Sequence, residues 1–303
     1  MLFILYLNLL KNMKVGLMDI DGHNFPNLAL MKISSFHKSF GHEVNWINFY
    51  EQYDKVYISK IFTFSPDNGF VINSKEIIKG GTGYDPKIEL PSYIDKLTCD
   101  YTLYPKFESA YGFITRGCPN KCSWCIVPEK EGNIRRYMDI ETILQGRKSA
   151  ILMDNNILAS DYGLEQIEKI IRLKIKVDFN QGLDARLIDR PIAKLLSRVK
   201  WLKPVRLSCD TLNMIKPVKK AMRYLREYDC TPQSYYINVL VKDVESALKR
   251  VKLLQKWDLD PFAQPYIEYS TKKRIPHEQE KFARWVNHKA IFNSVKWEDY
   301  NRL

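Results

Sequence analysis

The hydrophobic and polar positions form two successive α/β patterns along the chain. In the first third, four short apolar stretches are typical of buried strands: 14–20, 44–47, 55–59 and 76–79. A 3.6-residue periodicity over 28–40 predicts a helix between the first two of these strands. The glycine cluster at 80–83 and the proline-containing segment 84–105 predict a break and a linker. Residues 1–105 are therefore predicted to form a small Rossmann-like domain followed by a linker.

From residue 106 onward, strand-like and helix-like stretches alternate. The strand-like stretches are 111–115, 149–153, 175–179, 204–207, 235–241 and 262–266. The helix-like stretches between them are 140–145, 164–171, 191–199, 218–228 and 244–257. Parallel strands joined by helices predict a partial, TIM-like (βα)6 barrel over 106–270, whose working face lies just past the strand ends. The tail 271–303 is basic and aromatic, and we expect a helical extension there.

Charge separates the same two regions. The chain has 47 Lys plus Arg against 35 Asp plus Glu, a formal net charge of +12. Residues 1–105 hold ten Lys, no Arg and eleven acids, so the positive surplus lies in 106–303. This surplus permits a nucleic-acid partner, although a lysine-rich solvated surface is the simpler explanation.

The start of the chain and its cysteine content indicate a cellular location. Residues 1–10 are apolar, but they lack a basic leading region and are too short for a membrane span. We expect a strand extension there, or an upstream start codon ahead of Met13. Six cysteines in 303 residues are too few for a disulfide framework, so we expect a cytoplasmic protein with no membrane partner.

Three of the cysteines, Cys118, Cys122 and Cys125, fall within eight residues, directly after the first predicted barrel strand. Thiolates are the ligands of iron-sulfur clusters, and a cubane cluster normally takes four of them. With three nearby thiols, one iron would keep an open position. A zinc site is the alternative, and it would require a fourth ligand such as His23 or Cys99.

The spacing C-x3-C-x2-C, with Trp124 directly before the last cysteine, resembles the signature of the radical S-adenosylmethionine superfamily. The resemblance implies a [4Fe-4S] cluster on Cys118, Cys122 and Cys125, with S-adenosylmethionine chelating the open iron and Trp124 beside the adenine. It further implies an external one-electron reductant of the flavodoxin or ferredoxin type. The expected reaction is reductive cleavage of S-adenosylmethionine to a 5′-deoxyadenosyl radical, which abstracts hydrogen from a substrate that the sequence does not identify.

Polar residues follow the next three predicted strands, where the resemblance implies contacts to the ammonium, carboxylate and ribose of the nucleotide or to the substrate. These residues are Asp154, Asn155, Asn180, Asp184, Arg186, Ser208 and Asp210. Carboxylate and amide oxygens accept hydrogen bonds from an ammonium, and a guanidinium pairs with a carboxylate. The alternatives are a capped turn at 154–156 and a simple ion pair between Asp184 and Arg186.

The front region resembles a reduced cobalamin-binding domain. Residues 21–26 (DGHNFP) lie where that family carries D-x-H-x-x-G, and Gly80 with Gly81 matches its later glycine pair. The resemblance implies cobalamin as a further cofactor, with His23 as the cobalt ligand. Pro26 replaces the glycine of the motif, which favours a turn histidine instead.

Two other functions are consistent with the sequence. The first is an RNA-modifying enzyme similar to methylthiotransferases, favoured by the run at 115–122 and by the basic second half; the front region has no second three-cysteine set. The second is a non-catalytic iron-sulfur protein for electron transfer or binding. The incomplete thiol set and the polar strand ends favour an enzyme.

Overall fold

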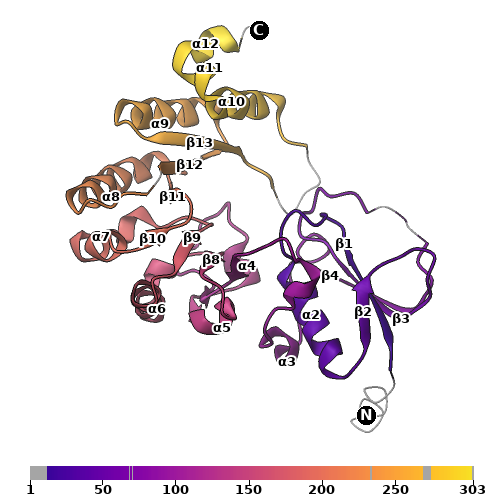
Figure 1. Ribbon diagram of the computed structural model, residues 1–303. Coiled ribbons are helices and arrows are strands. Elements are labelled where there is room, and N and C mark those ends of the chain that lie inside the picture. Colours follow the sequence, from indigo (N-terminus) through magenta and orange to yellow (C-terminus); the bar gives the residue numbers. More distant parts are fainter. Residues whose placement is uncertain (1–11, 68, 70, 233, 269–273, 302–303) are drawn as a thin grey trace. The chain divides into compact units, whose positions relative to one another are not determined.

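A computed structural model describes residues 12–67, 69, 71–232, 234–268 and 274–301 (Figure 1). The predictions for residues 1–10 lie outside this range. The chain divides into two compact units. The first comprises residues 1–111 with 141–147, and the second comprises 112–140 with 148–303.

The first unit contains a four-stranded parallel sheet in the order β2-β1-β3-β4. Its strands are β1 (Lys14–Asp19), β2 (Glu43–Trp46), β3 (Tyr53–Ser59) and β4 (Ser74–Gly80). Helix α2 (Leu28–Ser39) connects β1 to β2, and Asn27 caps it by accepting a hydrogen bond from the Leu30 amide at 3.3 Å. All four predicted strands and the predicted helix are present.

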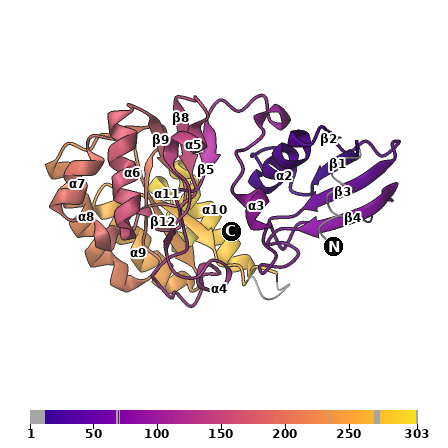
Figure 2. The ribbon, with the colours of Figure 1, turned by 90° about the horizontal axis from the view of Figure 1, so that it is seen from below.

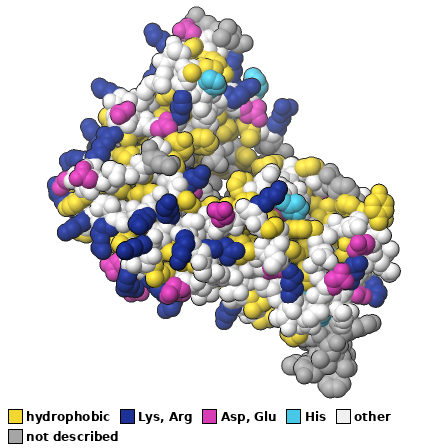
Figure 3. Space-filling view, viewed as in Figure 1, with side chains coloured by type: hydrophobic (Ala, Val, Ile, Leu, Met, Phe, Trp, Pro, Cys, Tyr) yellow, Lys and Arg dark blue, Asp and Glu magenta, His cyan; other side chains and the backbone are white. Residues whose placement is uncertain are grey.

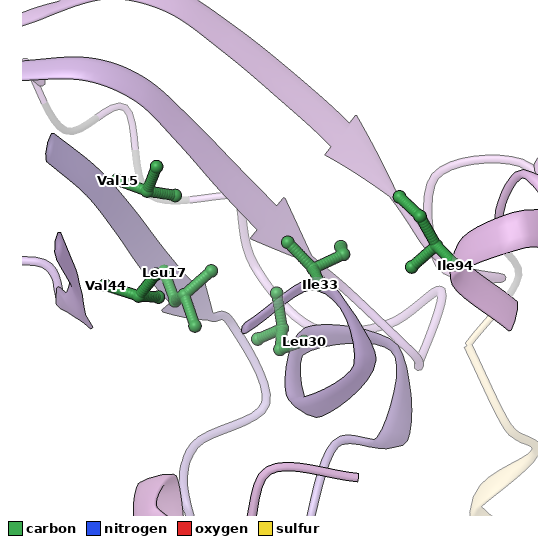
Figure 4. Close-up of a cluster of buried hydrophobic side chains, with 6 residues drawn as sticks. All are labelled: Val15, Leu17, Leu30, Ile33, Val44 and Ile94. Carbon is green, nitrogen blue, oxygen red and sulfur yellow. The ribbon is translucent and has the colours of Figure 1, made fainter. Parts of the chain in front are cut away.

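Six apolar side chains pack between this sheet and its helices (Figure 4): Val15, Leu17, Leu30, Ile33, Val44 and Ile94. Ile94 belongs to the short helix α3 (Ser92–Asp95), which is followed by the 3-10 turn η1 (Tyr101–Leu103). Tyr101 and Tyr104 are buried as well. Part of the predicted linker therefore packs into the core of the first unit.

The second unit contains parallel strands that follow one another in chain order. One sheet has the order β10-β9-β8-β5, and the other has the order β11-β12-β13. The bounds are β5 (Ala110–Gly112), β8 (Ser149–Leu152), β9 (Lys176–Phe179), β10 (Lys200–Trp201), β11 (Val205–Ser208), β12 (Tyr235–Val241) and β13 (Asp260–Pro265). The division between the units falls within β5, after Tyr111. An isolated parallel bridge between Leu183 and Leu207 joins the two sheets.

The six predicted barrel strands are thus found, together with the unpredicted β10. Pro204, which has no backbone N–H, separates β10 from β11. The α/β fold with parallel sheets is confirmed, whereas closure into a barrel stays a prediction.

One face of these strands is covered by helices α6 (Asp161–Arg172), α7 (Arg190–Leu196), α8 (Ile215–Glu227) and α9 (Val244–Lys256) (Figures 1 and 2). Helix α5 (Ile140–Leu144) lies almost entirely within the first unit. Strand β12 shows the resulting alternation, because Ile237, Val239 and Val241 are fully buried while Asn238 and Leu240 between them are half-buried. The opposite face of β12 is therefore less deeply buried.

The tail forms the predicted helical extension, with α10 (His277–Asn287), α11 (Lys289–Ser294) and α12 (Trp297–Tyr300). Phe282, Trp285 and Trp297 form its buried aromatic cluster. The Asn287 side chain accepts from the Ala263 amide at 2.8 Å and donates to the Ala263 carbonyl at 2.9 Å. Asn287 therefore pairs with the outer edge of β13 as a neighbouring strand would.

Candidate functional site

The three-cysteine loop lies inside a small antiparallel hairpin that the sequence did not predict. Strand β6 (Thr115–Arg116) leads into the loop, and β7 (Arg135–Arg136) leads out of it. The short helix α4 (Val127–Lys130) follows the last cysteine. Both ends of the loop are therefore fixed next to each other.

A glycine is required at the entrance of the loop. Gly117 has a φ of +81°, and a Cβ on it would lie 2.3 Å from the Asn133 carbonyl oxygen. The Cys118 amide donates to the Gly132 carbonyl at 3.1 Å. The two ends of the loop thus approach each other more closely than a side chain would allow.

Glu131 is a residue of this site that the sequence analysis did not select. Its carboxylate accepts from Arg116 at 2.8 and 3.0 Å, from the Gly117 amide at 2.9 Å and from the Asn155 side chain at 2.8 Å. Its side chain is only 8 % exposed. The charge of Arg116, two residues before Cys118, is therefore paired with Glu131.

The three thiols are partly buried and lie within electrostatic range of one another. Burial raises the pKa of Cys122 and of Cys125, and the neighbouring cysteines raise both further. The positive charge of Arg186 acts in the opposite direction on the pKa of Cys122. Without a metal these two thiols are therefore protonated at neutral pH, and metal binding would release their protons.

Asp154 and Asn155 follow β8, and both take part in holding the cysteine loop. Asp154 is buried and accepts from the Ile114 amide at 3.0 Å and from the Thr115 hydroxyl at 2.7 Å. Burial raises the pKa of Asp154 to about 6, although these hydrogen bonds favour its ionised form. The Asn155 side chain donates to Glu131. Asp154 thus connects the end of β8 to the strand before the thiols, and Asn155 connects it to Glu131 after them.

Asn156, the next residue, is also a contact that the sequence analysis did not select. It is 3 % exposed, and its amide nitrogen donates to the Cys118 sulfur at 3.7 Å and to Asp184 at 3.2 Å. Its amide oxygen is buried and has no hydrogen-bond partner within the described part of the chain. A buried acceptor without a donor is costly, and it indicates a position where a ligand can donate.

The ion pair between Asp184 and Arg186 is present, at 2.6 and 2.8 Å. Asp184 also accepts from Asn120 inside the cysteine loop at 3.1 Å. These hydrogen bonds lower the pKa of Asp184 despite its burial. Arg186 is about half-exposed, so its remaining donors can reach a ligand.

Asp210 lies past the end of β11, within electrostatic range of Cys122 and Cys125. It accepts from the Leu240 amide at 3.2 Å, and burial raises its pKa. The buried Arg250 on α9 donates to the carbonyls of Cys209 and Leu240 at 2.7 and 2.9 Å. Arg250 thereby ties the ends of β11 and β12 together behind Asp210.

The remaining predicted site residues have fewer hydrogen bonds to the cysteine loop and its neighbours. Trp124 and Ser208 are half-buried, and Ser208 pairs in register with Asn238 on β12. Asn180 is exposed, and its backbone amide donates to the Leu152 carbonyl at 2.8 Å. These three residues lie in the second unit, as do all the other predicted site residues.

Within the described ranges, no three His, Cys, Asp or Glu side chains are gathered in the way a single metal ion requires. A single ion needs all of its ligands about 2.0–2.5 Å from one point. In a cubane cluster each thiolate binds a different iron atom, so the sulfurs lie farther apart.

In the first unit, His23 is exposed after β1. Its ring lies 4.1 Å from that of Trp46 and 6.1 Å from that of Tyr104. The neighbouring Asp19 accepts from the Tyr104 hydroxyl at 3.2 Å. The polar groups at this end of the first sheet are thus engaged in local packing.

The chain is similar to known radical S-adenosylmethionine proteins, although no protein-family profile matches it. It is 25% identical over 238 residues to the ribosomal protein uS12 methylthiotransferase RimO of Caldicellulosiruptor saccharolyticus, covering 73% of this chain and 49% of RimO. The cobalamin-dependent S-adenosylmethionine radical enzyme OxsB, solved with aqua-cobalamin and S-adenosylmethionine, aligns with 95% of this chain and 57% of its own. The TM-score is 0.56 at 13% identity.

These similarities confirm the predicted resemblance at the level of the fold, which is that of radical S-adenosylmethionine enzymes. The chain spans about half the length of RimO. Of the helices that the structure describes, none has the length and apolar character needed to cross a membrane.

Proposed function

We propose that this chain is a radical S-adenosylmethionine enzyme whose cluster is held by Cys118, Cys122 and Cys125. The observation that carries the proposal is the convergence of three partly buried thiols with polar groups from the ends of neighbouring parallel strands. The Asn156 side chain donates a hydrogen bond to the Cys118 sulfur, and Asp184 accepts one from the cysteine loop. The positive charge of Arg186 acts to lower the pKa of Cys122. The fold and the distant similarity to RimO support the same assignment.

The residues present fit such a group. The three thiols would anchor three corners of a four-iron cluster. The buried Asn156 oxygen, next to Cys118, has no hydrogen-bond partner among the described residues and could accept from a ligand. The chemistry that such a cluster supplies when bound is transfer of one electron to S-adenosylmethionine, which yields methionine and a hydrogen-abstracting 5′-deoxyadenosyl radical. A flavodoxin or ferredoxin type of protein would supply that electron.

The residues of the chain would bind and orient the nucleotide. The Asn156 oxygen would accept from its ammonium group, and the exposed donors of Arg186 would hold its carboxylate. Ser208 and Asp210 would face its ribose, Trp124 its adenine, and Asn180 the nucleotide or the substrate. Asp154 and Asn155 would position the cysteine loop through Thr115 and Glu131.

Cobalamin is not part of this proposal. The His23 ring packs against Trp46 and Tyr104, and Pro26 occupies the glycine position of the cobalamin motif. We therefore assign no cobalt ligand in the first unit.

Anaerobic reconstitution with iron and sulfide tests the proposed function. With dithionite and S-adenosylmethionine, the full chain should form 5′-deoxyadenosine and methionine in equal amounts. Cys122→Ala should lose the brown chromophore and this activity, whereas Cys99→Ser in the first unit should keep both. Failure of the wild type to cleave S-adenosylmethionine, or zinc in place of iron after reconstitution, would overturn the proposal.

A methylthiotransferase is the second candidate, favoured by the similarity to RimO over 73% of this chain. This function would need a further sulfur donor, and the first 111 residues hold a single cysteine, Cys99. Mass spectrometry of ribosomal protein and RNA substrates for an added methylthio group would separate it from other radical reactions.

A further inference from the structure

The outer surface of α8 carries a concentration of positive charge that the proposed function does not use. Five of its thirteen residues are basic, and its one acid is Glu227: the basic residues are Lys216, Lys219, Lys220, Arg223 and Arg226. All five are exposed. Figure 3 shows Lys and Arg side chains gathered on the part of the surface that α7 and α8 form.

Several of these cations contact an aromatic ring, whereas few of them form salt bridges with acidic side chains. Lys220, Arg223 and Arg190 of α7 lie 5.7, 5.0 and 4.9 Å from the centre of the Tyr224 ring. Within the described part of the chain, Arg190 is the one of these three that forms a salt bridge, with Glu227 at 2.9 Å. Arg190 and, more weakly, Arg223 lower the pKa of Glu227. A ring face holds a cation in place without neutralising it, so its N–H groups stay available. Three like charges around one ring also repel each other, and a bound anion would relieve that repulsion.

The spacing of the cations fits a repeating anion. Lys216, Lys220 and Arg223 stand three or four residues apart, so they follow one side of the helix at roughly one per 5.4 Å turn. The apolar residues of α8, including Val218, Met222 and Leu225, are buried against the unit and cannot insert into a lipid surface. A chain of phosphates matches this pattern better than a membrane does.

We propose that the surface formed by Lys216, Lys220, Arg223 and Arg190 around Tyr224 binds the phosphate backbone of a nucleic acid. The surplus of positive charge in the second half of the chain supports this partner. The surface lies on the helical side of the strands and is independent of the cysteine loop. The inference therefore does not rest on the proposed enzyme activity.

The test compares two double variants with the same change in charge. Lys220→Ala with Arg223→Ala removes two exposed cations, neither of which forms a salt bridge with another described residue, although the charge of Arg223 contributes to lowering the pKa of Glu227. Lys249→Ala with Lys252→Ala on α9 removes two lysines paired with Glu245 and Glu298 at 2.7 and 3.1 Å. Fluorescence anisotropy of a labelled 20-nucleotide single-stranded RNA, measured from 50 to 200 mM KCl, reports binding.

The α8 double variant should bind the RNA about tenfold more weakly at 100 mM salt, and its salt slope should fall by about 1.4, or 0.7 for each lost contact. The α9 variant should stay within twofold of wild type. The charge-preserving pair Lys220→Arg with Arg223→Lys should restore binding, which separates loss of charge from misfolding. Equal affinities of the α8 and α9 variants would overturn the proposal.

Two further probes check the class of partner. A labelled polyglutamate peptide and vesicles containing phosphatidylserine should bind at least tenfold more weakly than the RNA at the same salt concentration. If either binds as tightly and depends equally on Lys220 and Arg223, the assignment to nucleic acid is wrong. Formation of 5′-deoxyadenosine by the α8 variant should match wild type, so failure of either proposal can be recognised separately.

Discussion

The two units use parallel strands in different ways. In the second unit, the segments after β5, β8, β9 and β11 bring thiols, amides, carboxylates and a guanidinium into contact or electrostatic range of one another. In the first unit, the residues at the end of β1 and just after it make internal contacts instead, as Asp19 does with Tyr104 and His23 does with Trp46. Parallel architecture alone therefore does not make a reactive centre. The second unit differs because its convergent groups include a buried amide oxygen, that of Asn156, without a hydrogen-bond partner among the described residues.

Substitution of one glycine in each unit is the strongest test of the difference between the two units. Gly117 in the second unit and Gly81 in the first have φ values of +81° and +97°, and a Cβ on either would lie 2.3 or 2.4 Å from a backbone oxygen. Alanine at either position should cost about 1–3 kcal/mol of unfolding free energy because of backbone strain. Gly117→Ala should also reduce bound iron per chain at least tenfold, whereas Gly81→Ala should leave it unchanged. Iron analysis after reconstitution and urea unfolding measure the two effects, and equal iron loss would remove the contrast.

Acid should destabilise the first unit specifically. The buried His37 lies 2.8 Å from His42 and 3.0 Å from the Tyr57 hydroxyl, and burial, His42 and Lys55 lower its pKa to about 4. The unfolded chain, with a histidine pKa near 6.5, takes up the proton first, so stability should fall between pH 6.5 and 4 by up to about 3 kcal/mol.

Hydrogen exchange of residues 28–46 at pH 7, 6 and 5 measures this loss. His37→Gln should flatten the dependence. An unchanged slope in that variant would assign the effect to another group.

Removing the charge of Glu131 tests the second unit without touching a thiol. Glu131→Gln leaves Arg116 without its carboxylate and should lower the unfolding free energy by about 2 kcal/mol. Glu245→Gln breaks an exposed pair with Lys249 and should cost less than about 0.5 kcal/mol. Urea unfolding of the two variants gives the comparison, and equal costs would contradict the central role of Glu131.

The smallest expected effect concerns the edge of β13. Asn287→Ala removes both hydrogen bonds to Ala263 and should cost about 1 kcal/mol. The exposed strand edge should also increase self-association at high protein concentration, which light scattering detects. Asn293→Ala on the next helix is the matched control, and equal scattering by both variants would argue against edge protection.

The sequence predicted the parts of the site that have a local signature. The spacing of Cys118, Cys122 and Cys125 was enough to place them on one loop after the first strand. Glu131 was missed because its partner Arg116 lies 15 residues earlier and strands β6 and β7 are two residues long. Such a short hairpin leaves no periodic pattern in the sequence.

Long-range contacts could not be predicted either. Nothing local separates Asn156 from Asn155, yet one touches Cys118 and Asp184 and the other touches Glu131. In the first unit, the prolines of 84–105 indicated a linker, but Ile94 packs against β1 and α2. The alternation of strands and helices, in contrast, followed directly from hydrophobic periodicity and was recovered along both units.

The break between β10 and β11 has a consequence for motion. The two sheets of the second unit meet through the bridge from Leu183 to Leu207 and the ion pair of Asp178 with Arg206. Asp184 and Arg186 lie on one side of this seam, while Ser208 and Asp210 lie on the other. A hinge at this seam would allow the two sheets to move relative to each other. A nucleotide that contacted both sides would restrict that movement.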